Sequence, residues 1–273
     1  MDVPLGPFIP NAAEGVDALR IIIGGALGRM GRELAAAAET AGVAVALGVD
    51  VAYQGQEWSF PMTTSYDEAR TQADVLIDFS KPNALGSLLN FCEMHCLPAV
   101  LCATGYTAEE LMRMEGAART IPLLRSANMS LGINVMEQLV AMAAVALGDQ
   151  FDIEIVEKHH RMKADSPSGT ALQLYESVKK QLAGGVKPAY GHFGRARLRE
   201  EGDVGLHAVR GGTISGEHEV GFYGEGEQLL LTHRAENRAI FSRGALAAAR
   251  FLLGKPAGLY SMGDVVAKML ESV

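Results

Sequence analysis

The sequence of 273 residues has few cysteines, no long apolar run and fewer basic than acidic residues. Its three cysteines, Cys92, Cys96 and Cys102, lack the paired spacing of a zinc knuckle, so they are expected to be buried, reduced thiols. Lysine and arginine number 24 against 32 aspartate and glutamate residues, a formal net charge of -8. This balance argues against general affinity for nucleic acid or anionic membrane, and any acidic ligand must be held by a local cluster.

No stretch reaches the roughly 18 uncharged apolar residues of a membrane span. Residues 1–19 contain early prolines and lack the basic start and apolar run of a signal peptide. We therefore expect a cytoplasmic protein without membrane association, in which residues 1–19 form a short flexible tail. The remaining composition, 48% hydrophobic and 21% charged, is typical of one large or two modest globular domains.

Residues 20–32, RIIIGGALGRMGR, precede the helix-like run ELAAAAETA. The three isoleucines predict a buried strand, and the glycines that follow predict a sharp turn into a helix. Such a turn lets the backbone approach a pyrophosphate, while the first helical turn offers N–H groups to the anion. A dinucleotide site is one interpretation, and a tight strand-to-helix turn in another kind of α/β protein is the alternative.

A second apolar run ends at Asp50, close to where an acid that accepts from the adenosine ribose is expected. Three further apolar runs, at 73–80, 98–105 and 121–128, alternate with helix-compatible segments and end in small or polar residues. This order favours a parallel sheet with ligands at the carboxyl edge of its strands, although ordinary turn chemistry would also explain the strand ends. The candidate cofactor-binding residues are Gly25, Gly28, Arg29, Met30, Asp50, Phe79, Ala103, Thr104, Gly105, Ala127, Asn128 and Met129.

After residue 130 the pattern changes from alternating strands and helices. INVMEQLVAMAAVAL has helical spacing, FDIEIVE alternates like a half-buried strand, and 183–203 resembles a long connection. The expected fold class is α/β: a Rossmann-type dinucleotide-binding domain and a second, smaller α/β domain with an open mixed sheet. The expected ranges are 1–130 for the first domain, 131–240 for the second, and 241–273 for a C-terminal segment that returns to the first.

Residues 157–170, EKHHRMKADSPSGT, concentrate cationic and proton-donating groups in an acidic chain. Histidine ordinarily titrates near neutral pH and is a natural general acid, and Lys163 can supply a fixed charge or a second proton source. Adjacent histidines point in different directions, so His159 and His160 are poor joint metal ligands. Because no carboxylate or thiol lies at a suitable spacing, no metal site is expected.

The run Ser166–Thr170 leads into a helical segment, for which Pro167 fits the entry and Ser168 or Thr170 can be the cap. Amides at such a helix start suit a carboxylate ligand. The candidate groups are the amides of Ser168, Gly169 and Thr170 with the side chains of His160 and Lys163. The alternative is that SPSGT is only a helix cap and HHRMK a solvated charged turn.

Long motifs stand in order along nearly the whole chain from Arg20: GGALGRMGR, DFSKP, CATGY, SANMSLGINV, EKHHRMKADSPSGTA, RGGTISGEHEV and FSRGALAAARFLLGKPAGLYSM. Together they closely resemble the dihydrodipicolinate reductase family. GGALGRMGR resembles its nucleotide-binding turn, DFSKP and CATGY its nicotinamide-side strand ends, and SANMSLGINV its interdomain helix entry. EKHHRMKADSPSGTA resembles the signature of the family.

The resemblance implies reduction of the cyclic dicarboxylate 4-hydroxy-tetrahydrodipicolinate to tetrahydrodipicolinate, with loss of water, by hydride from NADH or NADPH. This is a step of lysine and diaminopimelate biosynthesis. It also implies that His159 is the general acid, that Lys163 assists it, and that the substrate carboxylates are held by His160, Lys163, Ser168, Gly169 and Thr170. Finally, it implies a homotetramer assembled through the sheet of the second domain.

The chain departs from the family pattern at Val51, which follows Asp50 where some members carry arginine. We therefore expect NADH or dual use, although Arg29 could still reach a 2'-phosphate. Relative to the family pattern, the connection between the helix after Thr170 and Arg210 is short, which leaves the tetramer contacts open. Two rival functions also stay open: another two-domain NAD(P)-dependent dehydrogenase, which would not need the 157–170 run, and a non-catalytic dinucleotide sensor, in which His159 would be dispensable.

Overall fold

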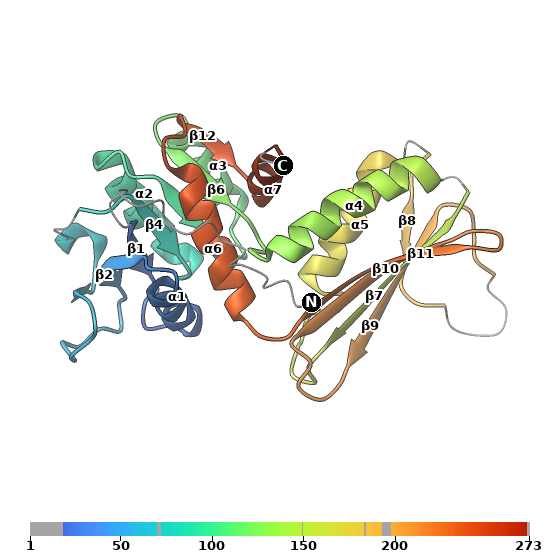
Figure 1. The fold of residues 1–273 in the computed structure, drawn as a ribbon, viewed down its shortest axis with the longest axis horizontal. Helices are drawn as coiled ribbons and strands as arrows, with labels where there is room; N and C mark the ends of the chain where they lie inside the picture. Colours follow the sequence, from blue (N-terminus) through green and yellow to red (C-terminus); the bar gives the residue numbers. More distant parts are fainter. Residues whose placement is uncertain (1–18, 70–71, 149, 183, 193–197, 272–273) are drawn as a thin grey trace, which may run out of the picture. The chain divides into compact units, whose positions relative to one another are not determined.

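The computed structural model describes residues 19–69, 72–148, 150–182, 184–192 and 198–271. Almost all of the expected flexible tail, residues 1–18, lies outside this part. The chain divides into two compact units (Figure 1). The first comprises the chain up to Leu123 together with Ala249–Leu259, and the second comprises Leu124–Ala248 together with the chain from Tyr260 onward.

The sheet of the first unit has the order β12-β6-β5-β4-β1-β2-β3. Every pairing among β1 to β5 is parallel, and the strand order reverses between β1 and β4, as in a Rossmann-type fold. This confirms the predicted parallel sheet. The strands are β1 (Arg20–Gly24), β2 (Ala44–Val49), β3 (Met62–Thr63), β4 (Val75–Asp78), β5 (Ala99–Leu101), β6 (Pro122–Arg125) and β12 (Gly258–Tyr260).

Helices α1 (Arg29–Thr40), α2 (Leu85–Met94) and α3 (Ala108–Ala117) connect these strands, with short 3-10 turns at Tyr66–Glu68 and Pro82–Ala84. Strand β1 is buried on both faces, since Ile21, Ile22 and Ile23 are all 0% exposed. A parallel strand covered on both sides needs apolar residues at every position instead of alternate ones. The three consecutive isoleucines therefore explain the central place of β1.

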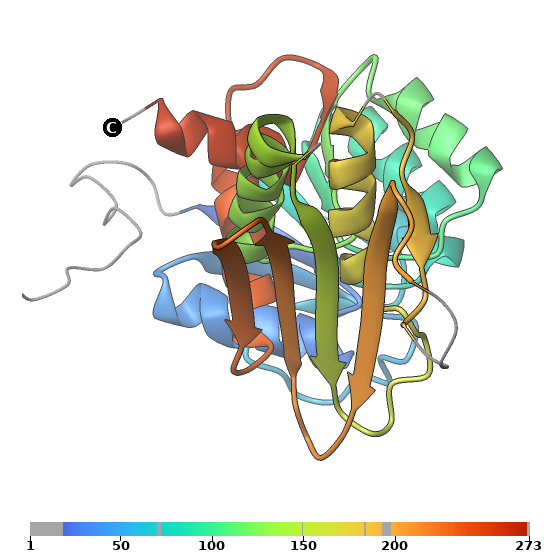
Figure 2. The ribbon, with the colours of Figure 1, turned by 90° about the vertical axis from the view of Figure 1, so that its right-hand side faces the viewer.

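The second unit contains an open mixed sheet, as predicted, with the order β11-β10-β7-β9-β8. Strand β9 runs parallel to β7 and β8, whereas β10 runs antiparallel to β7 and β11. In Figure 2 this sheet faces the viewer, and α4 and α5 lie behind it. The elements are α4 (Leu131–Leu147), β7 (Asp152–His159), α5 (Gly169–Gln181), β8 (Lys187–Ala189), β9 (Asp203–Arg210), β10 (Gly216–Tyr223), β11 (Gln228–Ala235), α6 (Ala239–Leu252) and α7 (Met262–Leu270).

The side chains of strand β7 alternate between the two faces of this sheet. Ile153 and Ile155 are buried in the core with residues of α4 and α5, and we call their side the helix face. Side chains alternate along a strand, so Glu157 and His159 also belong to the helix face, whereas Glu154 and Val156 lie on the opposite, open face. The two faces carry different chemistry.

The division between the units falls at Leu123/Leu124, while the sequence places the first boundary after residue 130. Hydrogen bonds explain the difference: Asn128 donates to Thr170 at the start of α5, and Asn134 of α4 donates to the carbonyls of Asn128 and Ser130. These bonds join the segment after β6 to the second unit. Of the C-terminal segment expected to return to the first unit, only residues 249–259 do so.

Candidate active site

A row of polar side chains occupies one end of the helix face, where β7 ends and α5 begins. Glu157 and His159 lie on β7, Arg210 on β9 and His218 on β10. In the strand register His218 is directly opposite Glu157, and Arg210 is directly opposite His159. The same alternation that buries Ile153 and Ile155 thus brings these side chains together at the edge of an apolar core.

Glu157 is the centre of this row and is fully buried. Its carboxylate accepts two hydrogen bonds of 2.7 Å from the Arg210 guanidinium and one of 3.0 Å from the Ser168 amide, and it lies 2.6 Å from His159 Nδ1. Burial alone would raise the pKa of Glu157, but the hydrogen bonds from Arg210, His159 and Ser168 lower it. Because an ionised carboxylate only accepts hydrogen bonds, Nδ1 of His159 must carry the proton that it shares with Glu157.

His159 is therefore held with its other ring nitrogen, Nε2, available for proton exchange. Its side chain is buried apart from a small exposed fraction. A Cβ atom at Gly216 would lie only 3.1 Å from Nε2, so the glycine keeps the space beside this nitrogen open. A histidine oriented by a carboxylate through Nδ1 and free at Nε2 is an arrangement suited to general acid–base catalysis.

His218 supports this arrangement without adding charge. Its Nε2 lies 3.0 Å from Oγ of Ser168, which caps α5 by accepting a hydrogen bond from the Ala171 amide. Burial, assisted by the charge of His159, lowers the pKa of His218 from 6.5 to about 4. His218 is therefore neutral at pH 7, and its edge contact with the His159 ring, at 5.1 Å between centroids, joins that ring to the start of α5.

The predicted cationic ligands His160 and Lys163 lie in the turn that follows β7. The Lys163 amide donates to the His160 carbonyl at 3.1 Å, which closes this turn. The Lys163 ammonium lies 2.9 Å from an Asp165 oxygen, and the hydrogen bond it donates lowers the pKa of Asp165 despite partial burial. Lys163 is therefore charge-balanced within the loop, and an anionic ligand would have to share it with Asp165.

Helix α5 begins at Gly169, with Ser168 as its cap, so the predicted cap is confirmed at Ser168. The Ser168 amide already donates to Glu157. Gly169 is exposed at the first helical position, and Thr170 Oγ1 accepts a hydrogen bond of 3.0 Å from Asn128. Of the three amides predicted as anion ligands, that of Ser168 thus has an internal role, and that of Gly169 hydrogen-bonds the Asp165 carboxyl and lowers its pKa. All three stand at the positive end of the helix.

The glycine turn of the first unit has the geometry that a pyrophosphate requires. Gly25 has φ +70°, and a Cβ there would lie 2.9 Å from the backbone of Ser80. A Cβ on Gly31 would lie 2.2 Å from the Gly25 carbonyl oxygen, so both positions exclude larger residues. Gly28 is the N-cap of α1 and has no side chain that could accept a hydrogen bond. The first amides of the helix can therefore donate to the backbone of the turn or to a ligand.

Asp50 lies directly after β2 and holds this turn. One carboxylate oxygen accepts from the Leu27 amide and the other from the Ala52 amide, both at 2.9 Å. Each oxygen keeps a further lone pair for a ligand hydroxyl. Of the remaining predicted cofactor residues, the first unit contains Arg29, Met30, Phe79, Ala103, Thr104 and Gly105, and the second unit contains Ala127, Asn128 and Met129.

Four polar residues of these regions were missed from the sequence: Glu157, His218 and Asp78, which are buried, and Arg210, which is half-buried. Strand alternation could have indicated Glu157, because it lies two residues before His159 and therefore on the same face. Asp78 ends β4 and is only 2% exposed, and burial raises its pKa from 3.8 to about 6 despite hydrogen bonds from Ser80. A Cβ on Gly24 would meet both Asp78 and the Tyr66 hydroxyl, which explains the glycine at this point.

Two family models match the chain: "Dihydrodipicolinate reductase, N-terminus" over residues 19–129 and "Dihydrodipicolinate reductase, C-terminus" over 132–266. The 4-hydroxy-tetrahydrodipicolinate reductase of Caldanaerobacter subterraneus subsp. tengcongensis is 44% identical over 251 residues, covering 92% of this chain and 99% of that one. The enzyme of the same name from Clostridium tetani is 41% identical over 245 residues, covering 89% and 95%.

Among solved structures, the dipicolinate-bound dihydrodipicolinate reductase from Paenisporosarcina sp. TG-14 is similar in fold, with a TM-score of 0.76 at 21% identity. That match covers 90% of this chain and 98% of the other. A myo-inositol dehydrogenase from Corynebacterium glutamicum has a TM-score of 0.58 at 14% identity, covering 94% and 96%. At such low identity both similarities concern the fold alone.

Proposed function

The chain belongs to the dihydrodipicolinate reductase family, and on that premise we propose that it reduces 4-hydroxy-tetrahydrodipicolinate to tetrahydrodipicolinate with NADH or NADPH, in lysine and diaminopimelate biosynthesis. The observation that carries the proposal within the structure is His159, held at Nδ1 by the buried carboxylate of Glu157 and available at Nε2. A dehydrogenase of the other two-domain kind would not need this row, and a dinucleotide sensor would not need an oriented acid.

The substrate is a cyclic dicarboxylate, whereas the chain carries a net charge of -8. Binding therefore depends on local positive groups. We assign the two carboxylates to the side chains of His160 and Lys163 and to the start of α5 at Ser168, Gly169 and Thr170. When a substrate carboxylate binds, it replaces Asp165 as the partner of the Lys163 ammonium, so this ammonium stays paired before and after binding.

Bound NADH or NADPH supplies the hydride. When one carbon of the conjugated ring accepts the hydride, an electron pair moves to another atom of the conjugated system, and that atom must then take up a proton. His159 donates this proton from Nε2, and the Glu157 carboxylate stabilises the ring through the change of charge. Lys163 assists by its fixed positive charge beside the developing anion. Loss of the 4-hydroxyl group of the substrate as water gives the conjugated ring that accepts the hydride, and the proton and the hydride together then complete the reduction.

For the cofactor, the first unit provides a glycine turn that only glycine can form at Gly25 and Gly31, and this geometry fits a pyrophosphate. We assign the adenosine ribose to Asp50. Because Val51 follows Asp50, we propose NADH or dual use, with exposed Arg29 as the candidate for a 2'-phosphate. A catalytic efficiency with NADPH more than about tenfold above that with NADH, roughly 1.4 kcal/mol, would contradict this preference.

We also propose that the protein is a cytoplasmic homotetramer assembled through the open face of the second sheet. Leu230 of β11 and Val209 of β9 lie on that face and are 43% and 45% exposed, which supports a contact between copies. No helix within the described residues is long and apolar enough to cross a membrane. The cysteines are free thiols, buried at Cys92 and Cys102 but exposed at Cys96, contrary to the expectation for Cys96; free thiols suit a reducing compartment.

The test of the proposed role is the steady-state rate of His159→Gln with freshly generated substrate. We expect kcat to fall by about 10²-fold or more, as loss of a general acid predicts, while NADH affinity is unchanged. His95→Gln is the matched control, because His95 is an exposed histidine at the end of α2, and it should keep the wild-type rate. A His159→Gln enzyme with unaltered kcat would overturn the assignment.

A further inference from the structure

The open face of the second sheet contains a second cluster of titratable side chains. The ligand atoms of Glu154, His192 and His207 all lie within 4.8 Å of one another. Glu154 belongs to β7, like Glu157 and His159, but its side chain projects from the opposite face. The cluster is therefore separate from the polar row that contains His159.

Strand register and one glycine bring this cluster together. Glu154 pairs with Gly205 across the parallel β7–β9 ladder, and His207 lies two residues after Gly205 on the same face. A Cβ on Gly205 would lie 1.6 Å from Glu154 Oε2, so only glycine lets the carboxylate fold across β9. The carboxylate thereby comes within 2.6 Å of His207 Nε2, while His192, after β8, lies 3.3 Å from its other oxygen.

The donor atoms and their spacing suit a transition metal. Two imidazole nitrogens and one carboxylate oxygen form a ligand set of zinc-type sites that keep positions open for water. With bonds of about 2.0–2.1 Å, two ligands of a tetrahedral ion lie about 3.3 Å apart. The Glu154–His192 distance already equals this value. His207 Nε2 lies 2.6 Å from the other oxygen, so the carboxylate must rotate about its soft terminal torsion to offer one oxygen to an ion held by both imidazoles.

Space for the remaining ligands is present beside the cluster. A pocket of about 440 Å³ is lined by Glu154, His192 and Tyr223, together with Asp152, Leu198 and Arg199. Water molecules in this pocket could complete the coordination of an ion held by the three side chains. The ion would then join β7, β9 and the segment after β8.

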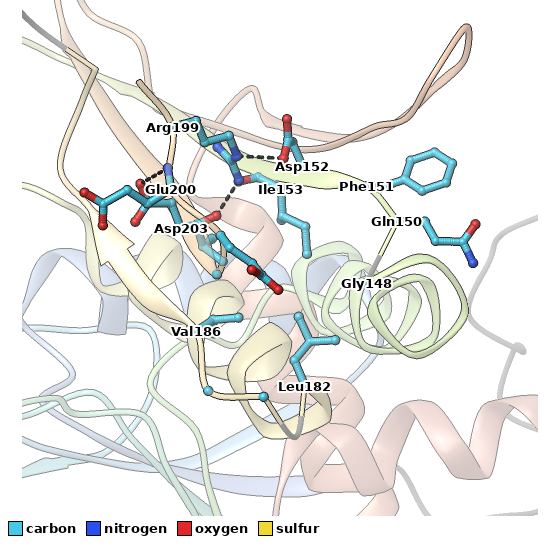
Figure 3. A pocket seen from close by; sticks show the side chains of 15 residues that line it. Gly148, Gln150, Phe151, Asp152, Ile153, Leu182, Val186, Arg199, Glu200 and Asp203 are labelled. Atoms are coloured by element: carbon cyan, nitrogen blue, oxygen red, sulfur yellow. Dashed lines mark hydrogen bonds and ion pairs between the residues drawn. The ribbon is translucent and has the colours of Figure 1, made fainter. Parts of the chain in front are cut away.

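Arg199 is the group that opposes such an ion, because its Nη1 forms a close ion pair with the same Glu154 carboxylate. The guanidinium also has other partners: Nε lies 2.8 Å from Asp152, and Nη2 donates to the Ile153 and Asp203 carbonyls. Figure 3 shows Arg199 held by these groups beside a neighbouring pocket of about 450 Å³. Arg199 can therefore release Glu154 and remain anchored, but its charge must weaken the binding of a cation.

We propose that Glu154, His192 and His207 form a binding site for one divalent transition-metal ion of the zinc class, with Arg199 as a competing cation. The ion has a structural role, since no residue of the proposed catalytic row takes part. No metal site is expected from the sequence, so this proposal departs from that expectation and uses histidines other than His159 and His160. The proposal is independent of the proposed function, because it concerns metal binding and not turnover.

The experiment titrates Zn²⁺ by calorimetry, and Co²⁺ by visible absorption, into the full chain after treatment with a chelator. We expect one ion per chain, the absorption of nitrogen- and oxygen-ligated cobalt, and a higher Tm with metal. His192→Ala and His207→Ala should each weaken Zn²⁺ binding by at least about tenfold. Binding should also weaken at acid pH, because protons compete for the imidazoles.

Arg199→Met supplies the sharpest test, because it removes the competing charge and should tighten Zn²⁺ binding several-fold. An adventitious site elsewhere on the surface would not respond to this change. His95→Ala is the matched control and should bind like the wild type. Circular dichroism and NADH binding verify that each variant is folded. Absence of stoichiometric binding, or binding that is lost in His159→Ala and retained in His207→Ala, would overturn the proposal.

Discussion

At the end of β7 a buried carboxylate decides which nitrogen of a histidine can exchange a proton. Glu157 is 0% exposed and is kept ionised by Arg210, so it fixes the proton of His159 on Nδ1. The role of Glu157 is one of positioning, because the group that would meet the substrate is Nε2 of His159. Changing Glu157 should therefore affect kcat and its pH dependence more than KM.

Glu157→Gln should lower kcat by about 10²-fold or more and change KM much less, since a glutamine nitrogen cannot accept the Nδ1 proton and the wrong tautomer becomes accessible. The alkaline limb of the kcat–pH profile, where the general acid loses its proton, should also move. Glu219→Gln, which changes a glutamate on the open face of the neighbouring β10, serves as the control with a wild-type profile. A reduced rate with an unmoved pH profile would point to a purely structural role.

The buried carboxyl of Asp78 leads to a prediction about how the free energy of unfolding depends on pH. Burial raises the pKa of its carboxyl from 3.8 to about 6 in the folded chain, so the folded state binds the proton more tightly than the unfolded state does. The free energy of unfolding therefore falls as pH rises from about 4 to about 6, by roughly 3 kcal/mol. Asp78→Asn mimics the protonated acid and should remove this loss.

Urea unfolding of both proteins at about pH 4 and about pH 7.5 measures the effect of Asp78. We expect nearly equal stabilities at the lower pH and a more stable Asp78→Asn variant at the higher pH. Equal stabilities at both values would mean that Asp78 is not the source of the pH dependence.

Around His159, the site residues that the sequence predicted lie close together in the chain. Arg210 and His218, which were missed, lie far along the chain from their partners. His159, His160 and Lys163 stand in one short run, so their chemistry is visible without a fold. Arg210 is 53 residues from Glu157, and His218 is 50 residues from Ser168. Only the pairing of β7 with β9 and β10 brings these groups together, and a single sequence does not specify that pairing.

Among the elements, the strand–turn–helix unit of residues 20–40 is the part that the sequence predicted best. Its apolar run and glycines are local signals that identify β1 and α1 directly. Strands β3, β8 and β12 have only two or three residues, too few for a periodic pattern, and β8 lies within the predicted connection. Strand β5 is equally short but stands within the predicted apolar run 98–105. The order of the second sheet depends on long-range pairing and was likewise not predictable.

Gly31→Ala tests the glycine turn as a unit. The new Cβ would lie 2.2 Å from the Gly25 carbonyl oxygen, which is backbone and cannot rotate away. Helix α1 and the turn must therefore separate, and we expect NADH affinity, measured by fluorescence titration, to fall at least about tenfold.

Gly116→Ala is the matched control for the glycine turn, because no atom lies within 4 Å of its new Cβ in α3. It should keep NADH affinity and gain about 0.5–1 kcal/mol of stability from helix propensity. If Gly31→Ala bound NADH like the wild type, the assignment of this turn to the cofactor would be wrong.

At the scale of the whole molecule, the two faces of one sheet separate two kinds of chemistry. The helix face contains at its end the polar row with Glu157 and His159, and the open face contains the Glu154 cluster and exposed apolar side chains such as Leu230. The composition was typical of one large or two modest globular domains, and the structure has two units. The sequence could not predict the position of the first boundary, because the hydrogen bonds of Asn128 that attach its segment to α4 and α5 are made with the fold.

The exposed apolar side chains on the open face of the second sheet lead us to predict that the protein is a tetramer. Sedimentation of the wild type should give a mass about four times the 29.0 kDa of the chain. Leu230→Glu places a charge on that face and should reduce the mass, whereas the NADH affinity of the first unit should be unchanged. A wild-type monomer at the concentration of the enzyme assay would contradict the homotetramer.

The central claim is the reaction itself, and the transfer of label tests it most directly. The wild type is incubated with freshly generated 4-hydroxy-tetrahydrodipicolinate and with NADH, or separately NADPH, deuterated at the transferable position, and the product is analysed by mass spectrometry. We predict tetrahydrodipicolinate carrying one deuterium for each nicotinamide oxidised, as direct hydride transfer requires. A folded enzyme that binds NADH but forms no labelled product would contradict the account and favour a dinucleotide sensor.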